Sequence, residues 1–185
     1  LGLAISLSIV EAHGGHIDVA SKRGEGAEYR RTALQKYADY VHEQKDFPLA
    51  QFRGRHSSVT EAVGYGKALM GFHMLRQQMG DDAFRQALGF FYKTYRGQRA
   101  SFSDVQSVFE KFSGQDLGRF FDEWTNRTGA ADLQLASVKV TQQDKRYTVS
   151  GEIRQQQNGA YALEVPVVVA TAAGPVITKV RSRDP

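Results

Sequence analysis

The sequence has no cysteine, only one tryptophan and four prolines, and no run of like charges longer than a pair. The absence of cysteine excludes disulfide bonds and thiolate metal sites, and it leaves the cellular compartment unassigned. The net charge of +4 comes from basic residues scattered among 20 acidic ones. This scatter indicates a solvated surface, so we expect no nucleic-acid partner.

Long hydrophobic runs are missing as well. The apolar stretch at residues 1–10 is too short to span a bilayer and has no basic residues ahead of it. We therefore expect neither a signal peptide nor a membrane segment in this chain. The first residue is not methionine, and we expect an upstream portion of the protein. The composition, 41% hydrophobic and 24% charged, is typical of a folded globular chain.

The hydrophobic pattern changes twice along the chain and predicts three parts, residues 1–28, 29–132 and 133–185. The first part has a short apolar helical pattern, a strand-like stretch and a glycine-rich turn. The second is a succession of amphipathic helices, and the third alternates at period two. These patterns together predict a multi-part α+β fold.

Five helical segments are expected in the second part, over residues 30–41, 58–80, 81–97, 101–114 and 115–129. Asp81 is the expected cap of the third segment. Ser101 and Asp104 have the spacing of a capping box at the start of the fourth. Glycine follows each of these two helices, at Gly97 and Gly114, where a helix commonly ends.

Four strands are expected in the third part, over residues 133–140, 146–155, 161–171 and 175–181, separated by turn sequences. We expect them to form one antiparallel sheet. Pro166 lies inside the third strand and favours an edge position or a bulge there.

Gly2 and Leu3 lie at the start of the chain, and the sequence "SIVEAHGG" follows at residues 8–15. With these motifs, residues 1–28 resemble the end of the ATP-binding domain of sensor histidine kinases: Gly2 and Leu3 match the end of that family's glycine box, and "SIVEAHGG" matches the helix that follows it. The resemblance makes Gly2 and Leu3 a remnant of a cofactor-binding loop, in which backbone amides approach phosphate oxygens. The family's magnesium-binding helix, its adenine-contacting box and its phosphoacceptor histidine are absent, so we expect no ATP binding.

Two stretches of the helical part stand out, "AVGYGKALMGFHMLRQQMGDDAF" at residues 62–84 and "SFSDVQSVFEKFSGQDLGRFFDEWTNRTGAADL" at residues 101–133. Through them about 105 residues, from 30 to 135, resemble the C-terminal half of the catalytic domain in the aminopeptidase N family of gluzincin zinc metallopeptidases. The chain departs from the family at Ala68, where many relatives have glycine, and at Ala131, where proline is usual. Residues 133–185 resemble part of the β-sandwich domain that follows in these peptidases.

The resemblance implies one catalytic residue in this chain. The tyrosine of the family's Y-x-K-G motif donates its hydroxyl to the oxyanion of the tetrahedral intermediate, and Tyr65 matches it by position. A neutral phenol provides a directed hydrogen bond where negative charge develops.

No metal site is expected in the chain itself. The family holds zinc with two histidines of H-E-x-x-H and a glutamate on the next helix. The sequence "HEQKD" begins like this motif, but Asp46 occupies the position of the second histidine. We interpret His42 and Glu43 as surface residues and His73 as a hydrogen-bonded core residue.

These observations predict part of a zinc-dependent aminopeptidase that lacks its zinc-binding half and is inactive alone. Its implied partners are a peptide substrate and the missing N-terminal half. One alternative is a signalling histidine kinase fused to a peptidase-like module, with the junction near residues 28–31. Another is a non-catalytic peptide-binding module that uses a groove around Tyr65.

Overall fold

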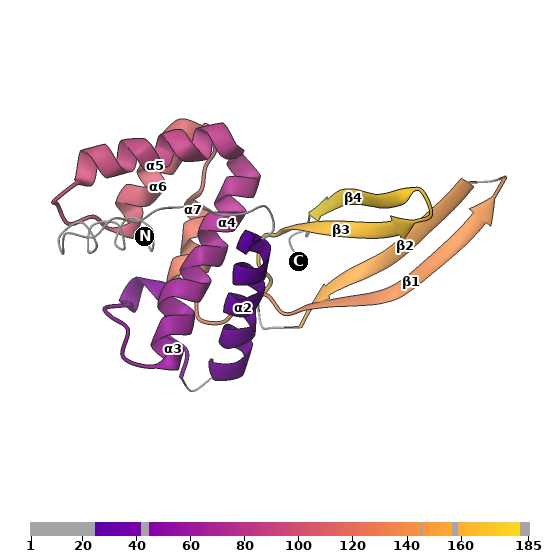
Figure 1. Ribbon diagram of the computed structural model, residues 1–185, viewed down its shortest axis with the longest axis horizontal. Coiled ribbons are helices and arrows are strands. Elements are labelled where there is room, and N and C mark those ends of the chain that lie inside the picture. Colours follow the sequence, from indigo (N-terminus) through magenta and orange to yellow (C-terminus); the bar gives the residue numbers. More distant parts are fainter. Residues whose placement is uncertain (1–24, 42–44, 145, 157–158, 182–185) are drawn as a thin grey trace. The chain divides into compact units, whose positions relative to one another are not determined.

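The computed structural model describes residues 25–41, 45–144, 146–156 and 159–181. The chain divides into two units, a helical one that ends at Gly129 and a strand unit that starts at Ala130. Figure 1 labels the α-helices of the first and the strands of the second. The content of helices and antiparallel strands confirms the expected mixed α+β class.

Helices make up the first unit. In chain order they are α2 (Glu25–Tyr40), η1 (Leu49–Gln51), α3 (Ser58–Glu61), η2 (Ala62–Lys67), α4 (Ala68–Met79), α5 (Asp81–Tyr95), α6 (Phe102–Ser113), α7 (Gly118–Phe121) and η3 (Asp122–Asn126). All five expected helical segments are present. None of the helices in the described residues is long and apolar enough to cross a membrane.

The expected helix at residues 58–80 contains a change of helical type that the sequence pattern does not predict. It begins at a capping box, in which the Ser57 side chain accepts from the Thr60 amide and Thr60 accepts from the Ser57 amide. The chain then runs through α3, a π-helical turn (η2) and α4. A π-helical turn widens the helix locally and is frequent at functional sites. Tyr65 lies within this turn.

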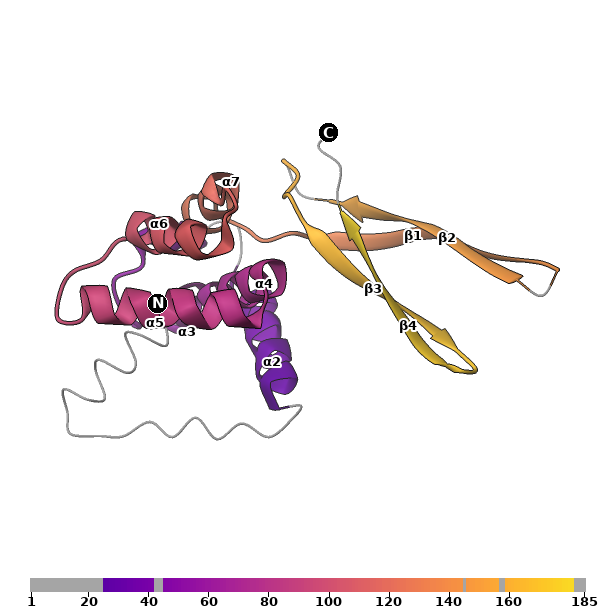
Figure 2. The ribbon, with the colours of Figure 1, turned by 90° about the horizontal axis from the view of Figure 1, so that it is seen from above.

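The larger hydrophobic core lies among α4, α5 and α6. Phe109 is fully buried at its centre. The rings of Phe72 and Phe84 meet the Phe109 ring edge to face, with centroid separations of 5.9 and 5.6 Å. Figure 2 shows α5 and α6 running side by side. A smaller core consists of Leu49 of η1, Val63 of η2 and Ala68 of α4, and Tyr37 of α2 packs against it.

Most of the predicted helix ends are confirmed. Ser101 and Asp104 form the expected capping box of α6, and Gly114 ends that helix in the left-handed conformation with φ of 66°. The prediction that Asp81 caps α5 is wrong. Gly80 is the N-cap, with φ of 85°, and Asp81 belongs to the first helical turn. The Asp81 carboxylate instead accepts hydrogen bonds of 2.7 and 2.9 Å from Arg76.

The strand unit contains two hairpins. Strands β1 (Leu133–Gln143) and β2 (Arg146–Gln155) form one antiparallel sheet, and β3 (Glu164–Thr171) and β4 (Gly174–Arg181) form another. The four strands are close to those predicted, but the expectation of one four-stranded sheet is wrong. In a two-stranded sheet every strand is an edge strand, so Pro166 in β3 lies at an edge as predicted.

A bulge in β1 keeps its apolar side chains on one face. The register shifts between Ala136 and Lys139, and Ser137 has φ of 53°. Leu135 pairs with Ile153 and Val140 pairs with Val149. Since positions 153 and 149 share a face of β2, Leu135 and Val140 share that face although they are five positions apart.

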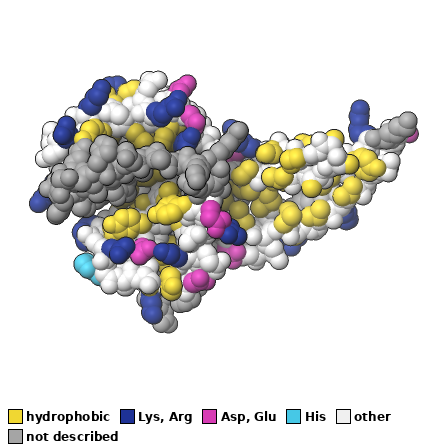
Figure 3. Space-filling view, in the orientation of Figure 1, with side chains coloured by type: hydrophobic (Ala, Val, Ile, Leu, Met, Phe, Trp, Pro, Cys, Tyr) yellow, Lys and Arg dark blue, Asp and Glu magenta, His cyan; other side chains and the backbone are white. Residues whose placement is uncertain are grey.

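Apolar side chains of the strand unit are widely exposed. Leu135, Val140 and Tyr147 keep 64%, 62% and 66% of their accessible area. The space-filling view shows hydrophobic side chains spread over the strands (Figure 3). Patches of this kind mark surfaces that contact other protein or ligand.

Candidate functional site

Tyr65 is the one predicted catalytic residue that lies among the described residues. Its side chain is 37% exposed, on a helix whose neighbouring positions Gly64 and Gly66 are buried. It lines a small cavity of about 40 Å³ between η2 and α2, to which Tyr29, Ala33 and Lys36 also contribute. The backbone on both sides of Tyr65 is thus buried, whereas the Tyr65 side chain is partly exposed to solvent.

The segment after η1 packs closely on the turn that carries Tyr65. A Cβ atom on Gly64 would lie 2.2 to 2.5 Å from three atoms of the Phe52 ring, so any other residue at this position would have to displace that ring. The Phe52 ring meets the Tyr65 ring edge to face, with centroids 5.7 Å apart and planes at 80°. This is a favoured geometry for an aromatic pair.

Helix α2 closes the other side of the turn. A Cβ atom on Gly66 would lie 3.5 Å from the carbonyl oxygen of Ala33, an ordinary contact distance. Nearby, Lys36 Nζ donates a 2.9 Å hydrogen bond to the Glu61 carboxylate. This bond lowers the pKa of Glu61 and raises the pKa of Lys36. An ion pair therefore lies beside Tyr65 at the edge of the cavity.

Lys67 follows Tyr65 by two positions and is buried, with 3% of its area exposed. Its Nζ donates a 2.6 Å hydrogen bond to the backbone carbonyl oxygen of Arg127. Burial lowers the pKa of Lys67 to about 8; the Asp46 carboxylate opposes this shift and the Arg127 guanidinium adds to it. The lysine thus connects the Tyr65 turn to the end of the helical unit.

Asp46 holds the same end of the unit from another side. Its carboxylate accepts hydrogen bonds from the Tyr37 hydroxyl (3.0 Å), from the Phe47 amide (2.8 Å) and from the Gly129 amide. The residue that interrupts the H-E-x-x-H pattern is therefore a structural acceptor that joins α2 to the chain after η3.

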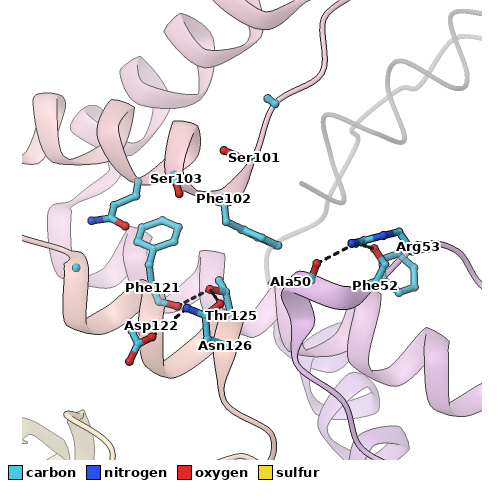
Figure 4. A pocket seen from close by; sticks show the side chains of 13 residues that line it. Ala50, Phe52, Arg53, Ser101, Phe102, Ser103, Phe121, Asp122, Thr125 and Asn126 are labelled. Atoms are coloured by element: carbon cyan, nitrogen blue, oxygen red, sulfur yellow. Dashed lines mark hydrogen bonds between the residues drawn. The ribbon is translucent and has the colours of Figure 1, made fainter.

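A larger cavity of about 680 Å³ also has Phe52 in its lining. Figure 4 shows the other lining residues, which come from the region of η1, from the start of α6 and from α7 with η3. Several lining groups bond to one another: Thr125 Oγ1 donates to the Phe121 carbonyl (2.6 Å), and Asn126 Nδ2 donates to Asp122 (2.9 Å). We assign no ligand to this cavity.

Comparison with known proteins points to peptidases. Aminopeptidase 2 of Candida albicans is 22% identical over 107 residues, which are 55% of this chain and 11% of that protein. Probable aminopeptidase 2 of Sulfurisphaera tokodaii is 24% identical over 91 residues, 48% of this chain and 12% of that protein. Aminopeptidase N of Lactococcus lactis is 29% identical over 68 residues, 37% of this chain and 8% of that protein. No family model matches the chain.

The chain is distantly related to aminopeptidases. The matched stretches span only about a tenth of the length of the first two of these relatives. The similarity therefore relates a limited portion of such an enzyme to this chain.

The residues that the structure describes do not fit a zinc ion. Among them, no group of three or more histidine, aspartate or glutamate side chains is placed to hold a metal. His42 and Glu43 lie outside the described residues, as do Gly2 and Leu3 of the kinase-like stretch. His73 lies half-buried on α4, where burial and then the charges of Arg30 and Arg76 lower its pKa.

The sequence pattern did not identify Phe52 as part of this region, and it did not predict the contacts that Lys67 and Asp46 make. Gly64 and Gly66 on either side of Tyr65 are the only local hint, because paired glycines often mark a close approach of backbone segments. Nothing in the pattern indicates that Phe52 is the approaching residue. The contacts of Lys67 and Asp46 join positions 60 and 83 apart, which no local pattern encodes.

Proposed function

We propose that this chain forms the helical portion of a larger zinc-dependent aminopeptidase of gluzincin type, in which Tyr65 stabilises the oxyanion. The observation that carries the proposal is Tyr65 itself, a partly exposed phenol on a π-helical turn within a sequence related to aminopeptidases. The proposed substrates are peptides with a free N-terminus.

Tyr65 suits this role chemically. When water attacks a peptide carbonyl, negative charge develops on the carbonyl oxygen, and a hydrogen-bond donor aimed at that oxygen lowers the barrier. A neutral phenol donates a stronger hydrogen bond to the charged oxyanion than to the neutral substrate carbonyl. It therefore stabilises the transition state more than the bound substrate. Gly64 lets the Phe52 ring pack directly on the backbone beside Tyr65.

In such an enzyme zinc would polarise the substrate carbonyl and activate the water. The described residues of this chain do not supply the ligands, so its proposed contribution is confined to the hydroxyl of Tyr65 and its surroundings. The zinc ligands belong, in this proposal, to an N-terminal half that precedes the helical unit. We expect the 185-residue chain alone to bind neither zinc nor ATP and to be inactive.

We also propose how the chain is organised. In this proposal residues 29–132 are the catalytic-domain portion, and residues 133–185 belong to a β-sandwich in which further strands cover the apolar face. The exposed apolar face of the β1 and β2 hairpin supports this assignment. In this proposal residues 1–28 are a fragment that resembles the ATP-binding domain of a histidine kinase.

The test is a single long DNA read through the source locus, across the codons for residues 25–31 and about a kilobase on either side. The proposal predicts a break in the reading frame near residues 28–31, with H-E-x-x-H and the glutamate ligand that follows it encoded just ahead of the helical portion. An uninterrupted frame with a complete histidine kinase upstream would overturn it in favour of the fused signalling protein.

A further inference from the structure

We propose that Phe52 is a positioning residue that fixes the orientation of the Tyr65 ring. This inference rests on the proposed function, since it assigns Phe52 a purpose only if the direction of the Tyr65 hydroxyl matters. It concerns a residue outside the Y-x-K-G motif, thirteen positions before Tyr65 in the sequence.

The contact between the two rings is direct. Their centroids are 5.7 Å apart and their planes lie at 80°, so the edge of one ring meets the face of the other. Such a contact depends on direction, because the positive ring edge is attracted to the negative ring face. Rotation of the Tyr65 side chain about its first torsion would break it.

Gly64 brings the Phe52 ring into this position. The ring covers the space that a side chain at position 64 would fill, since three ring atoms lie within 2.5 Å of the point that a Cβ atom would occupy. Phe52 therefore packs on the backbone of the same turn that carries Tyr65. The two rings share a common base, so a displacement of one is transmitted to the other.

The backbone that carries Phe52 is itself fixed. Leu49 is buried, and the Phe52 amide donates a 3.0 Å hydrogen bond to its carbonyl oxygen. The Arg53 guanidinium donates to the carbonyl oxygens of Ala50 (2.9 Å) and Phe52 (3.0 Å), as the dashed lines in Figure 4 indicate. A side chain on such a rigid turn can hold a neighbour in place.

A smaller residue in place of Phe52 should let the Tyr65 ring turn. Phe52 also lines the cavity of about 680 Å³, so its removal leaves open space beside the Tyr65 ring. Phe52→Leu removes the ring and keeps an apolar side chain, whereas Phe52→Tyr keeps the ring.

The experiment is ¹⁹F NMR of the full chain labelled with 3-fluorotyrosine, in which Tyr65→Phe identifies the Tyr65 resonance among the eight tyrosines. We expect Phe52→Leu to broaden this resonance through added motion of the Tyr65 ring, beyond the shift that loss of the Phe52 ring current causes by itself. Phe52→Tyr should leave the resonance near its original position, and the additional signal of the ninth tyrosine is assigned by combining Phe52→Tyr with Tyr65→Phe. Phe90→Leu is the matched control: Phe90 is 37% exposed on α5 and its ring contacts Phe112. An unchanged width of the Tyr65 resonance in Phe52→Leu would overturn the proposal.

A second variant covers the case in which Phe52→Leu does not fold. Gly64→Ala keeps both rings but forces them apart, and it should move the Tyr65 resonance in the same way. An unmoved resonance in Gly64→Ala would count equally against the proposal. The resonance of Tyr95, whose ring lies 4.9 Å from that of Phe91 in the other core, reports that the fold is intact.

Activity separates this inference from the proposed function. In the longer enzyme, Phe52→Leu should lower kcat about tenfold or more with little change in KM, and Phe52→Tyr should restore it. If Tyr65→Phe leaves activity unchanged, the proposed function fails while the NMR result still stands. If Tyr65→Phe is inactive and Phe52→Leu is fully active, only the positioning role fails.

Discussion

Lys67 and Arg127 are joined by a 2.6 Å hydrogen bond from the lysine Nζ to the arginine carbonyl oxygen, across 60 positions of sequence. Lys67 belongs to the turn that carries Tyr65, and Arg127 lies where the helical unit ends. The bond holds the lysine amine in a buried position. There the charged form of the amine lowers the stability of the folded chain unless it is well paired. This relationship predicts a distinctive dependence of stability on pH.

The free energy of unfolding should rise between about pH 8 and pH 10.5 because of Lys67. The pKa of this group is about 8 in the folded chain and 10.5 when unperturbed. Between these values the unfolded chain binds more protons than the folded chain, so stability increases with pH. The contribution is on the order of 3 kcal/mol. Below about pH 8 the lysine is charged in both states and the gain is absent.

Urea denaturation of the wild-type chain and of Lys67→Met at several pH values measures this contribution. The stability difference between the two chains should change with pH across this window, since the variant has no group to titrate there. A difference that is constant with pH would contradict the assigned burial of Lys67.

Gly64→Ala should lower the free energy of unfolding by about 1 to 3 kcal/mol, because the added methyl group overlaps the Phe52 ring. Gly89→Ala is the matched control: it lies on α5 with nothing within 4 Å of the added atom. The control should gain stability of roughly 0.5 to 1 kcal/mol from helix propensity. Equal effects in the two variants would show that Phe52 does not press on position 64.

Asp46→Ala should lower the free energy of unfolding by about 2 to 3 kcal/mol, because it removes the carboxylate that accepts hydrogen bonds from the Phe47 and Gly129 amides and from the Tyr37 hydroxyl. Asp39→Ala is the control, since Asp39 makes an exposed contact with Gln35. Chemical denaturation should find the control within about 0.5 kcal/mol of wild type. A similar small effect in Asp46→Ala would mean that this residue does not hold the end of the unit.

Sequence patterns predicted the local elements well. The helical periodicity located the five main helical segments of the first unit, and the Ser101 and Asp104 spacing located the start of α6. The cap of α5 was mispredicted because Asp81 is a good capping residue whose carboxylate is used by Arg76 instead. The glycine before it takes the cap position with a positive φ, a conformation that favours glycine.

Features that depend on distant parts of the chain could not be predicted in the same way. The bulge at Ser137 follows from pairing with β2, and the sequence of β1 alone leaves it open. The single sheet that alternation suggested is two hairpins, because alternation identifies strands but not their partners. The contact between Phe52 and Tyr65 likewise depends on how the turn after η1 folds back.

The 185-residue chain alone should not hydrolyse aminoacyl amides. Its sequence contains no H-E-x-x-H motif, and in the proposed zinc aminopeptidase the activation of water depends on the bound metal. Release of 4-nitroaniline from an aminoacyl anilide by the pure chain, with and without a chelator, measures this. Chelator-sensitive hydrolysis by the pure chain would show that the chain holds a metal site of its own.

The most direct test of the central claim is the turnover of the proposed longer enzyme, compared between wild type, Tyr65→Phe and Tyr147→Phe. Tyr147 is an exposed tyrosine of the strand unit, 66% accessible, and serves as the matched control. We predict that Tyr65→Phe lowers kcat by about 10² to 10³ fold while the control retains wild-type turnover. Full turnover in Tyr65→Phe would contradict the oxyanion role.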